Sequence, residues 1–187
     1  MVDVLWGSKE SLKFITNVGL ITSYGPDGHN IMACEWTHHI SYSPGLIAVC
    51  IHKNDATASN IKETKEFGVN LASIEQSKMS SISGSSTGKK TDKIAVLKEL
   101  GFEFYKAKKI KPLMIKNSPL NVECKLYKEI ELGDHIIFVG EAVEATSNPI
   151  EALAYHDGKY WKMSTPLEKP SQEELDNINS VVEKYKK

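Results

Sequence analysis

The chain has 187 residues, enough to bury one sizeable hydrophobic core, and its 23 basic and 24 acidic residues nearly cancel. This balance excludes a chain-wide field that would attract nucleic acid or an anionic membrane, so a partner must be recognised by a local site. No stretch has the roughly 18 apolar residues of a membrane-spanning helix, and the start lacks the pattern of a signal peptide. We therefore expect one cytoplasmic domain over residues 1–187.

The first third of the chain alternates strand-like runs with turns. A helical pattern begins near Ser8, and three strands are then predicted at 19–24, 30–40 and 46–52. The turns between them are Pro26-Asp27-Gly28 and residues 42–45. We expect these three strands to pair consecutively as an antiparallel meander.

The rest of the chain adds helices between further strands. Helices are predicted at 57–65, 75–82 and 92–100, and strands at 67–73, 113–116, 121–132 and 135–145, the last two joined by a tight turn at Gly133-Asp134. Residues 171–174 form a capping box for a C-terminal helix over about 171–186. Strands outnumber helices without a βαβ alternation. The pattern favours a mainly β fold, a closed antiparallel barrel with helical insertions, whose core spans about residues 12–161.

The stretch HKNDATASNIKET at 52–64 places polar side chains where a helix begins after a buried strand. Asp55 or Thr57 would cap the helix, and its free N–H groups would hold a phosphate together with the side chains of Lys53, Thr57, Ser59 and Asn60. The alternative is an ordinary capped surface helix, since Thr, Ser and Asn are favoured at helix starts with or without a ligand.

A second polar stretch, SGSSTGKKTDK at 83–93, has the composition of an anion-binding loop. It lacks the Gly-x-x-x-x-Gly-Lys-Ser/Thr spacing of a nucleoside-triphosphate loop, which disfavours a nucleotide triphosphatase. The alternative is a flexible surface loop in which Thr91 or Asp92 caps the next helix. His135 and His156 stand in turns, where each is able to titrate near neutrality or is merely exposed. No nucleophile elbow is present, which disfavours a hydrolase.

Residues 32–39 are expected to alternate between a core face and a polar face of one strand. Met32, Cys34, Trp36 and His38 fall on one face, and Ala33, Glu35, Thr37 and His39 on the other. On a strand Cys34 and His38 would lie about 13 Å apart, too far for a shared metal ion. The cysteines at 34, 50 and 124 have no paired spacing, so we expect three packed thiols and no metal site.

Six segments taken together resemble the flavin reductase-like family of FMN-binding split barrels, which includes flavoredoxins and archaeal ferric reductases. They are GLITSYGPDGHNIMACEW, ISYSPGLIAVCI, ATASNIKETKEFGVN, SGSSTGKKTDK, LGDHIIFVGEAVEA and YHDGKYW, in family order over about residues 12–161. The resemblance implies a Greek-key antiparallel split β-barrel that forms a homodimer and binds FMN near the subunit interface, with FAD as the alternative cofactor.

The resemblance also assigns residues to the flavin. Thr57, Ser59 and Asn60 would hold the phosphate, with Lys53 nearby, where many members carry an arginine. Two segments would run along the ribityl chain and the ring: Met32, Ala33, Cys34, Glu35, Trp36 and Thr37, and then His52, Lys53 and Asn54. Asn30, Asn70, Ser85 and Lys93 match family positions near the flavin. Gly133-Asp134-His135 resembles the Gly-Asp-His motif that positions the nicotinamide, so His135 is the catalytic candidate.

The implied activity is that of an oxidoreductase that passes hydride from NAD(P)H to flavin and electrons onward to free flavin, a ferric complex or a protein partner. Hydride transfer needs face-to-face geometry more than a titrating side chain, which agrees with the lack of an acid–base dyad. Two alternatives are an FMN-holding electron carrier that does not oxidise NAD(P)H, and a barrel that binds no flavin. Absorbance of the purified protein and its bleaching by NAD(P)H separate the three.

Overall fold

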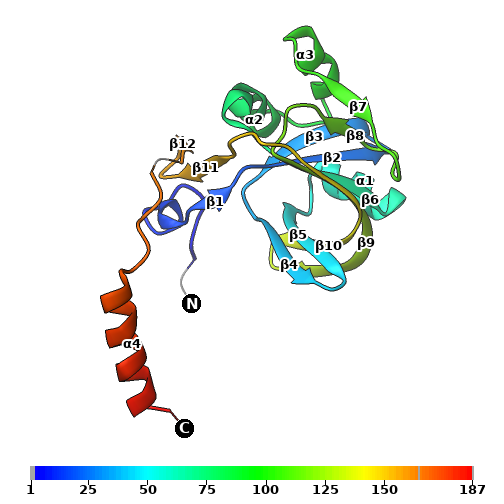
Figure 1. Cartoon of the computed structure of the whole chain (residues 1–187). Coiled ribbons are helices and arrows are strands. Elements are labelled where there is room, and N and C mark those ends of the chain that lie inside the picture. Colours follow the sequence, from blue (N-terminus) through cyan, green and yellow to red (C-terminus); the bar gives the residue numbers. More distant parts are fainter. Residues whose placement is uncertain (1–2, 164, 187) are drawn as a thin grey trace.

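The computed structural model describes residues 3–163 and 165–186, and it shows a mainly β protein with helices on its surface (Figure 1). The strands are β1 (Thr16–Asn17), β2 (Gly19–Gly25), β3 (Gly28–Cys34), β4 (Thr37–Tyr42), β5 (Gly45–His52), β6 (Glu66–Leu71), β7 (Phe104–Lys106), β8 (Leu113–Ile115), β9 (Leu120–Leu132), β10 (His135–Ser147), β11 (Leu153–His156) and β12 (Lys159–Lys162). The helices are η1 (Ser11–Lys13), α1 (Ala56–Thr64), η2 (Ile74–Gln76), α2 (Ser77–Ser85), α3 (Lys93–Glu99) and α4 (Gln172–Lys184).

Seven strands form one antiparallel sheet in the order β3-β2-β6-β9-β10-β5-β4, and this sheet curls into the split barrel (Figure 1). The long hairpin of β9 and β10 carries the bend, with register shifts after Val139 and Ala142. Gly140 lies at the first shift, where a Cβ atom would stand 2.5 Å from the Phe67 ring and 2.7 Å from Cys124 Cβ. A glycine is therefore required for the strand to approach its neighbours so closely. The predicted fold class is confirmed.

The predicted meander is wrong at one point. The run 30–40 is not one strand but two, because the chain turns at Glu35-Trp36 and β3 and β4 become the opposite edges of the sheet. Thr37 Oγ1 donates to the Cys34 carbonyl across the turn, and the Trp36 carbonyl accepts from Cys50 N–H. The predicted alternation of faces therefore fails beyond the turn, where Thr37 is buried and Trp36 and His38 are exposed.

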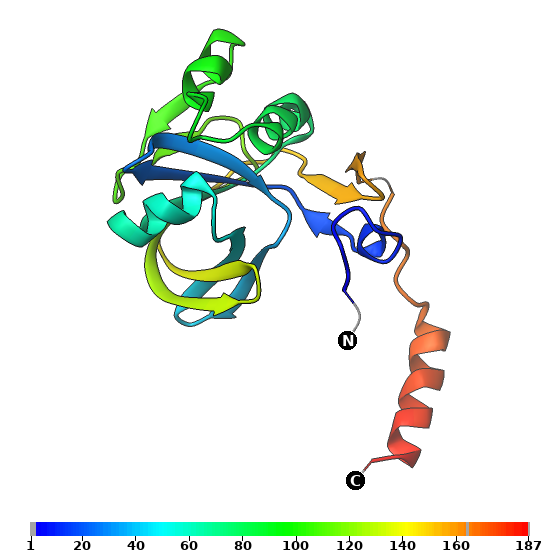
Figure 2. The same cartoon turned by 180° about the vertical axis from the view of Figure 1, so that it is seen from behind.

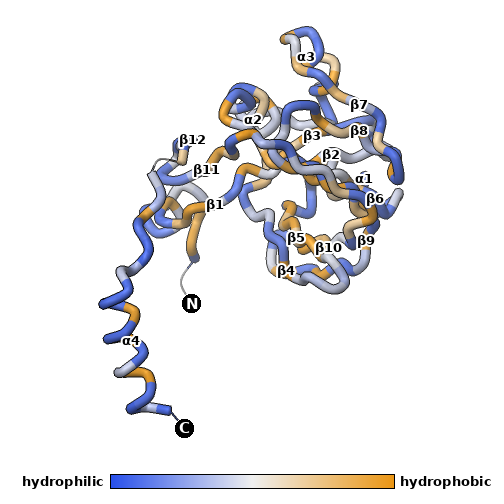
Figure 3. Tube along the Cα trace, viewed as in Figure 1, coloured by the Kyte–Doolittle hydropathy of each residue, from blue (hydrophilic) through white to orange (hydrophobic). Residues whose placement is uncertain are grey.

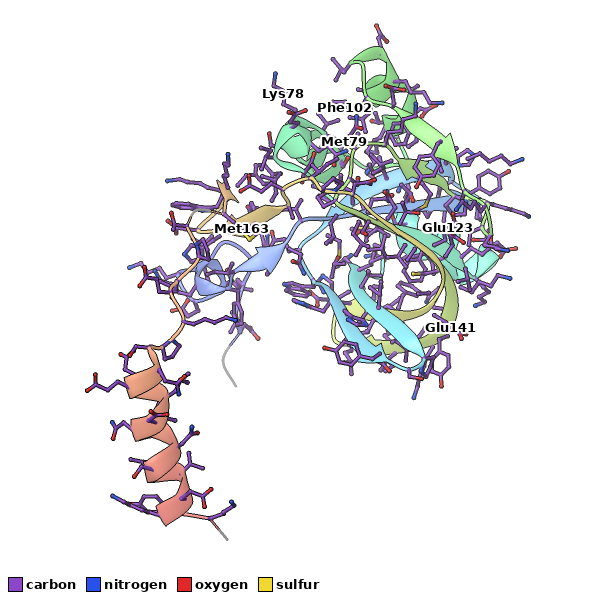
Figure 4. All side chains as sticks on the ribbon, viewed as in Figure 1. Lys78, Met79, Phe102, Glu123, Glu141 and Met163 are labelled. Carbon is purple, nitrogen blue, oxygen red and sulfur yellow. The ribbon has the colours of Figure 1, made fainter. Side chains whose placement is uncertain are left out.

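Of the three hydrophobic clusters among the described residues, two are large. Ile21, Val49, Ile51, Phe67 and Phe138 are among the buried residues of the barrel interior. A second cluster joins β2 and β3 to α2 and α3 and includes Leu20, Ile31, Met79, Leu97 and Ile115. Figure 4 labels Met79 on α2. The second cluster fixes α2 and α3 against the barrel, and with them the polar loop that joins these two helices.

The predicted helices and turns are mostly confirmed. Helix α1 begins at Ala56, the Asp92 carboxylate caps α3 by accepting from Ala95 N–H, and Ser171 and Glu174 form the predicted capping box of α4. The opening helix is reduced to one 3₁₀ turn, in which Ser8 Oγ accepts from Ser11 N–H. The segment 153–162, for which the sequence predicts no strand, is the hairpin of β11 and β12, in which β11 pairs with β1.

Helix α4 stands away from the barrel at the end of an extended segment, as both views show (Figure 2). Its apolar residues recur along one side, and each of its described residues is exposed (Figure 3). Within residues 3–163 and 165–186, none of the helices is of a length and hydrophobicity that would let it cross a membrane.

Candidate functional site

A small cavity of about 80 Å³ lies where strand β3, the start of α1 and the loop between α2 and α3 meet. Its lining residues are Asn30, Met32, Ala33, Asp55, Ala56, Thr57, Ser83, Gly84, Ser86, Thr87, Gly88 and Lys93. A water molecule takes about 30 Å³ in the liquid, so this space holds a few waters or one group of phosphate size and excludes a ring system. The two polar stretches singled out in the sequence, at 52–64 and 83–93, meet here.

The first turn of α1 offers backbone donors to this small cavity. Asp55 occupies the N-cap position with an extended conformation, and its side chain makes no capping hydrogen bond. The N–H groups of the first turn therefore have no side-chain acceptor in the described structure. Together with the positive end of the helix dipole, they favour an anion at this position. Asp55 is also among the lining residues, and its negative charge opposes an anion, so a cation is needed to balance it.

Three polar side chains in the small cavity have hydrogen-bonding capacity to spare. Asn30 Nδ2 donates to Thr57 Oγ1 at 2.8 Å, which leaves the Thr57 hydroxyl proton available. Within the described part of the chain, Asn30 Oδ1 and Ser83 Oγ are buried and have no hydrogen-bond partner. Buried polar atoms nearly always have a hydrogen-bond partner in folded proteins. Two buried atoms without one in the same cavity therefore indicate a ligand that would hydrogen-bond to them.

Lys93 supplies the balancing cation. Its Nζ donates to the carbonyls of Ser83 at 3.0 Å and Ser86 at 3.2 Å, and an ammonium has one further proton to donate. Burial lowers the pKa of Lys93 from 10.5 to about 8, and the nearby Asp55 carboxylate partly opposes that shift. The lysine is thus mostly charged at neutral pH, and an anion in the cavity would restore its affinity for the proton.

A larger cavity of about 420 Å³ adjoins the small one, with Ala33 and Gly84 shared by both. We call it the aromatic cavity because Trp6, Tyr155 and Tyr160 line it, together with Val18, Ala33, Cys34, Glu35, Ser80, Ser81, Gly84 and Ser85. Tyr160 Oη donates to Ser80 Oγ at 3.0 Å, which ties the β11–β12 hairpin to α2. Its volume is that of a cofactor or drug-sized ligand. A planar ring would find aromatic faces and the polar edge of β3 there.

The Cys34 thiol at this cavity is not a nucleophile. Burial raises the pKa of Cys34 to about 11, so the thiol is protonated at neutral pH. It donates to the Cys50 carbonyl at 3.3 Å. All three cysteines are free, as the sequence predicted. Within residues 3–163 and 165–186, no cluster of three or more His, Cys, Asp or Glu side chains is arranged to hold a metal ion.

A histidine pair marks the rim of the barrel where β5 ends and β10 begins. The His135 ring lies 4.8 Å from the Trp36 ring and 5.5 Å from the His52 ring, centroid to centroid. His135 Nδ1 is 2.7 Å from Asp134 Oδ1, and this contact lowers the pKa of the Asp134 carboxyl. The carboxylate fixes the orientation of the imidazole and leaves Nε2 free to meet a ligand.

Lys53 and Asn54 lie at this rim and do not line the small cavity. The ammonium of Lys53 is 4.0 Å from a Glu131 carboxylate, and Asn54 N–H donates to His52 Nδ1 at 3.3 Å. Lys53 is therefore not the cation that balances Asp55, a role that falls to Lys93.

Three residues expected near the flavin have structural roles instead. Asn60 is buried, and its amide donates to Ser23 Oγ and the Gly28 carbonyl and accepts from Asp27 N–H. The Asn70 amide is saturated within the core, where it bonds Leu20, Ile115 and Asn121. Thr37 closes the turn after β3. Their side-chain hydrogen-bonding groups are used within the protein, and none of the three lines the small or the aromatic cavity.

Ser59, also expected at the phosphate, does not line the small cavity. Residues two apart on an α-helix point about 200° apart, so Ser59 faces away when Thr57 faces the cavity. Of the other expected residues, Asn30, Met32, Ala33, Thr57 and Lys93 line the small cavity, and Ala33, Cys34, Glu35 and Ser85 line the aromatic one.

Several lining residues were missed by the sequence reasoning. The individual positions Ser83, Ser86 and Gly88 were not chosen within the Gly/Ser/Thr-rich stretch, although its composition indicated an anion site. Tyr155 and Tyr160 line the aromatic cavity and were missed because no strand was predicted for their segment. The Asp157-Gly158 pair between two aromatic runs is a strong hairpin signal and would have found them.

The fold and these cavities define a split-barrel protein with a small polar cavity at the start of α1 beside a larger aromatic cavity. Residues 11–164 match the family described as flavin reductase like domain. The chain is 36% identical over 135 residues, 72% of each chain, to an uncharacterized protein of Archaeoglobus fulgidus. A ferric-chelate reductase (NAD(P)H) of the same organism is 33% identical over 119 residues, 63% of this chain and 68% of that one.

Among solved structures, flavoredoxin from Methanosarcina acetivorans superposes with a TM-score of 0.75 at 23% identity, over 92% of this chain and 96% of that one. This likeness concerns the fold. The match over residues 11–164 together with the identities to the Archaeoglobus proteins means that the chain belongs to the flavin reductase-like family.

Proposed function

We propose that the protein is an FMN-binding oxidoreductase that uses NAD(P)H, with the flavin phosphate in the small cavity and the flavin ring in the aromatic cavity. A bound flavin supplies the redox chemistry, since it accepts hydride from a nicotinamide and passes electrons to an acceptor. The protein's part is to hold the ligands face to face and to exclude water between them. A cytoplasmic location, where NAD(P)H is available, belongs to the same proposal.

The observation that carries the proposal is the pair of orphaned polar atoms in the small cavity. Ser83 Oγ and the Thr57 hydroxyl are donors that an anionic phosphate would accept from, while Asn30 Oδ1 is an acceptor for a ribityl hydroxyl. Lys93 provides the positive charge, and the first turn of α1 provides backbone N–H groups. Charge, donors, acceptor and size all match the phosphate end of FMN.

The ring would lie along Ala33, Cys34 and Glu35 with Tyr155 and Tyr160 on the opposite wall. His135, held by Asp134 and packed against Trp36, would orient the nicotinamide at the outer rim. This is a positioning role. Trp36, at the rim, directly follows Glu35, which lines the aromatic cavity, so the rim lies next to that cavity.

Binding of FMN to two point variants tests the phosphate site. Thr57→Val and Ser83→Ala should each weaken FMN binding by about 1 to 3 kcal/mol, because each removes a hydrogen bond to a charged group. Ser59→Ala is the matched control and should leave the dissociation constant unchanged. Calorimetric titration measures all three. An effect of Ser59→Ala equal to that of Thr57→Val would favour the assignment made from the resemblance over the one made from the cavity.

Anaerobic reduction by nicotinamide tests the activity. Mixing the FMN-loaded protein with NADH or NADPH should bleach the visible flavin absorbance on a catalytic timescale. A flavin that stays oxidised with both nucleotides would leave an electron carrier that receives electrons from a protein partner. A purified protein that binds no FMN would leave a barrel with another ligand.

A homodimer is the final part of the proposal. Helix α4 presents Leu175, Ile178, Val181 and Val182 on an exposed side, and the barrel exposes Tyr42 and Tyr127. A second copy would cover such surfaces. Light scattering of the FMN-loaded protein should give twice the 20.8 kDa chain mass. A chain mass with flavin bound would contradict the dimer and leave the flavin site intact.

A further inference from the structure

The histidine pair at the barrel rim consists of His52, the last residue of β5, and His135, the first residue of β10. The two residues are directly opposite each other in the antiparallel register of these strands. Directly opposed residues project from the same face of a sheet, and the centroids of the two rings are 5.5 Å apart. The pair therefore presents two neighbouring imidazoles at one edge of the barrel.

The contacts of His52 determine which of its nitrogens carries a proton. Its Nδ1 accepts from Asn54 N–H at 3.3 Å. A backbone N–H group can only donate, so Nδ1 must present a lone pair, and the proton of the neutral ring is on Nε2. The outer nitrogen of His52 is therefore a hydrogen-bond donor.

The contacts of His135 place its proton on the other nitrogen. His135 Nδ1 is 2.7 Å from Asp134 Oδ1, and this hydrogen bond lowers the pKa of the Asp134 carboxyl. The carboxylate is ionised and can only accept, so Nδ1 is the donor. In the neutral ring Nε2 then has a free lone pair. The outer nitrogen of His135 is therefore a hydrogen-bond acceptor.

A donor and an acceptor on neighbouring rings are complementary to an amide, whose carbonyl accepts and whose N–H donates. Two ligands in the proposed reaction contain this group: the nicotinamide has a carboxamide, and the flavin has an imide edge on its pyrimidine ring. Neither histidine lines the small or the aromatic cavity, where the proposed function places the flavin. The exposed Trp36 ring, 4.8 Å from the His135 ring, provides an apolar surface beside the pair. These observations favour the nicotinamide.

We propose that the two histidines together recognise the carboxamide of the nicotinamide. His52 Nε2–H donates to its carbonyl, and His135 Nε2 accepts from its NH₂ group. The inference rests on the proposed function and deepens it, since it adds His52 as a specificity-determining residue and gives each histidine a different hydrogen bond. A carboxamide held at both its oxygen and its nitrogen keeps the nicotinamide ring in one orientation, which hydride transfer requires.

A nucleotide that lacks half of the amide separates the two contacts. In the reduced 3-acetylpyridine analogue of NAD(P)H, a methyl group replaces the NH₂ group and the carbonyl is retained. The half-saturating concentration for anaerobic bleaching of the FMN-loaded protein is measured with NAD(P)H and with this analogue. In the unaltered protein the analogue should require about five- to tenfold more, because one hydrogen bond is lost.

Substitution of each histidine should then give a different pattern. His135→Phe should raise the half-saturating concentration of NAD(P)H about five- to tenfold and leave that of the analogue within about twofold, because the analogue has no NH₂ group to lose. His52→Phe should raise both values about five- to tenfold, because both nucleotides have the carbonyl. FMN affinity in calorimetric titrations should stay within about twofold in both variants, which also shows that they are folded.

His39→Phe is the matched control, because His39 is an exposed histidine of the same sheet that packs on Tyr42 with ring centroids 4.9 Å apart. It should leave both half-saturating concentrations unchanged. Equal losses for NAD(P)H and the analogue in His135→Phe would overturn the inference, and so would an unchanged NAD(P)H value in His52→Phe.

The flavin imide is the other source of the same chemistry, and FMN affinity distinguishes it. Weaker FMN binding in both variants, with the ratio of analogue to NAD(P)H unchanged, would assign the pair to the flavin and overturn the inference. In each of these outcomes the unaltered protein still oxidises NAD(P)H, so the proposed function survives. A lack of bleaching in the unaltered protein would remove the proposed function, and this inference with it.

Discussion

Raising the pH from 7 to 9 is predicted to weaken FMN binding about tenfold, because it discharges Lys93 in the small cavity. Burial lowers the pKa of Lys93 to about 8, so most molecules carry the charge at pH 7 and few carry it at pH 9. A phosphoester has its second pKa near 6 and stays a dianion through this window. The lost attraction therefore comes from the protein and not from the ligand.

The same lysine gives the opposite pH dependence to the stability of the ligand-free protein. Its pKa is about 8 when folded against 10.5 ordinarily, a difference that corresponds to about 3 kcal/mol of penalty for the buried charge below pH 8. Between pH 8 and 10.5 the unfolded chain binds more protons than the folded one. Stability should therefore rise with pH there, by up to about 1.4 kcal/mol per pH unit.

The two opposing trends make a sharp assay. Calorimetric titration with FMN at pH 7, 8 and 9 gives the binding profile, and urea unfolding of the free protein gives the stability profile. Riboflavin, which lacks the phosphate, is the ligand control and should bind with no such profile. The Lys93→Met variant should bind FMN weakly at every pH. Its free energy of unfolding should no longer show the rise between pH 8 and 10.5 that comes from Lys93. A flat FMN profile, or a riboflavin profile parallel to that of FMN, would refute the role given to Lys93.

Three further substitutions test neighbouring features. Asn60→Ala should lower the free energy of unfolding by about 3 kcal/mol in urea titrations, since it removes three hydrogen bonds of a buried amide, and should leave FMN affinity nearly unchanged. Gly140→Ala should cost about 1 to 3 kcal/mol of stability by crowding Phe67, whereas Gly45→Ala, with 3.7 Å to its nearest atom, should cost about 0.5 kcal/mol or less. His135→Gln should raise the KM for NAD(P)H about tenfold at unchanged FMN affinity if the imidazole positions the nicotinamide, and an unchanged KM would remove it from the rim site.

The elements that could be predicted from the sequence are those whose cause is local. The hairpin of β9 and β10 follows from two alternating runs around Gly133-Asp134, and the start of α4 follows from the Ser171 and Glu174 capping box. Both depend on residues within a few positions of each other. A local pattern therefore suffices to place them.

The break between β3 and β4 could not be predicted because its causes are distant in the chain. The turn at Glu35-Trp36 is held from outside by Asn17 Nδ2, which donates to the Thr37 carbonyl, and by Cys50 N–H, which donates to the Trp36 carbonyl. The local sequence has no Gly or Pro at the turn and alternates as a continuous strand would. Pairing across the sheet overrides that local preference.

The sequence also could not decide which of Thr57, Ser59 and Asn60 faces the cavity, because the deciding contacts are again distant in the chain. All three are ordinary residues of a helix start. The β2–β3 turn engages Asn60, because the Asn60 amide accepts from Asp27 N–H and donates to the Gly28 carbonyl. These two residues lie 33 and 32 positions earlier in the chain. The resemblance located the segment, and only the tertiary contacts distinguish Thr57, which lines the small cavity, from Asn60, whose amide bonds the β2–β3 turn.

The strand break also creates the conditions for binding a planar ring. Because the chain turns at Glu35-Trp36, β3 ends the sheet with only β2 beside it. An edge strand has backbone N–H and C=O groups that no ladder pairs, and these normally invite aggregation. Here the edge at Ala33 and Cys34 faces the aromatic cavity, under cover of α2 and the β11–β12 hairpin. In the proposed function, a ring with hydrogen-bonding atoms along one side would pair with that edge as a further strand does, and an unfavourable feature of the sheet would serve binding.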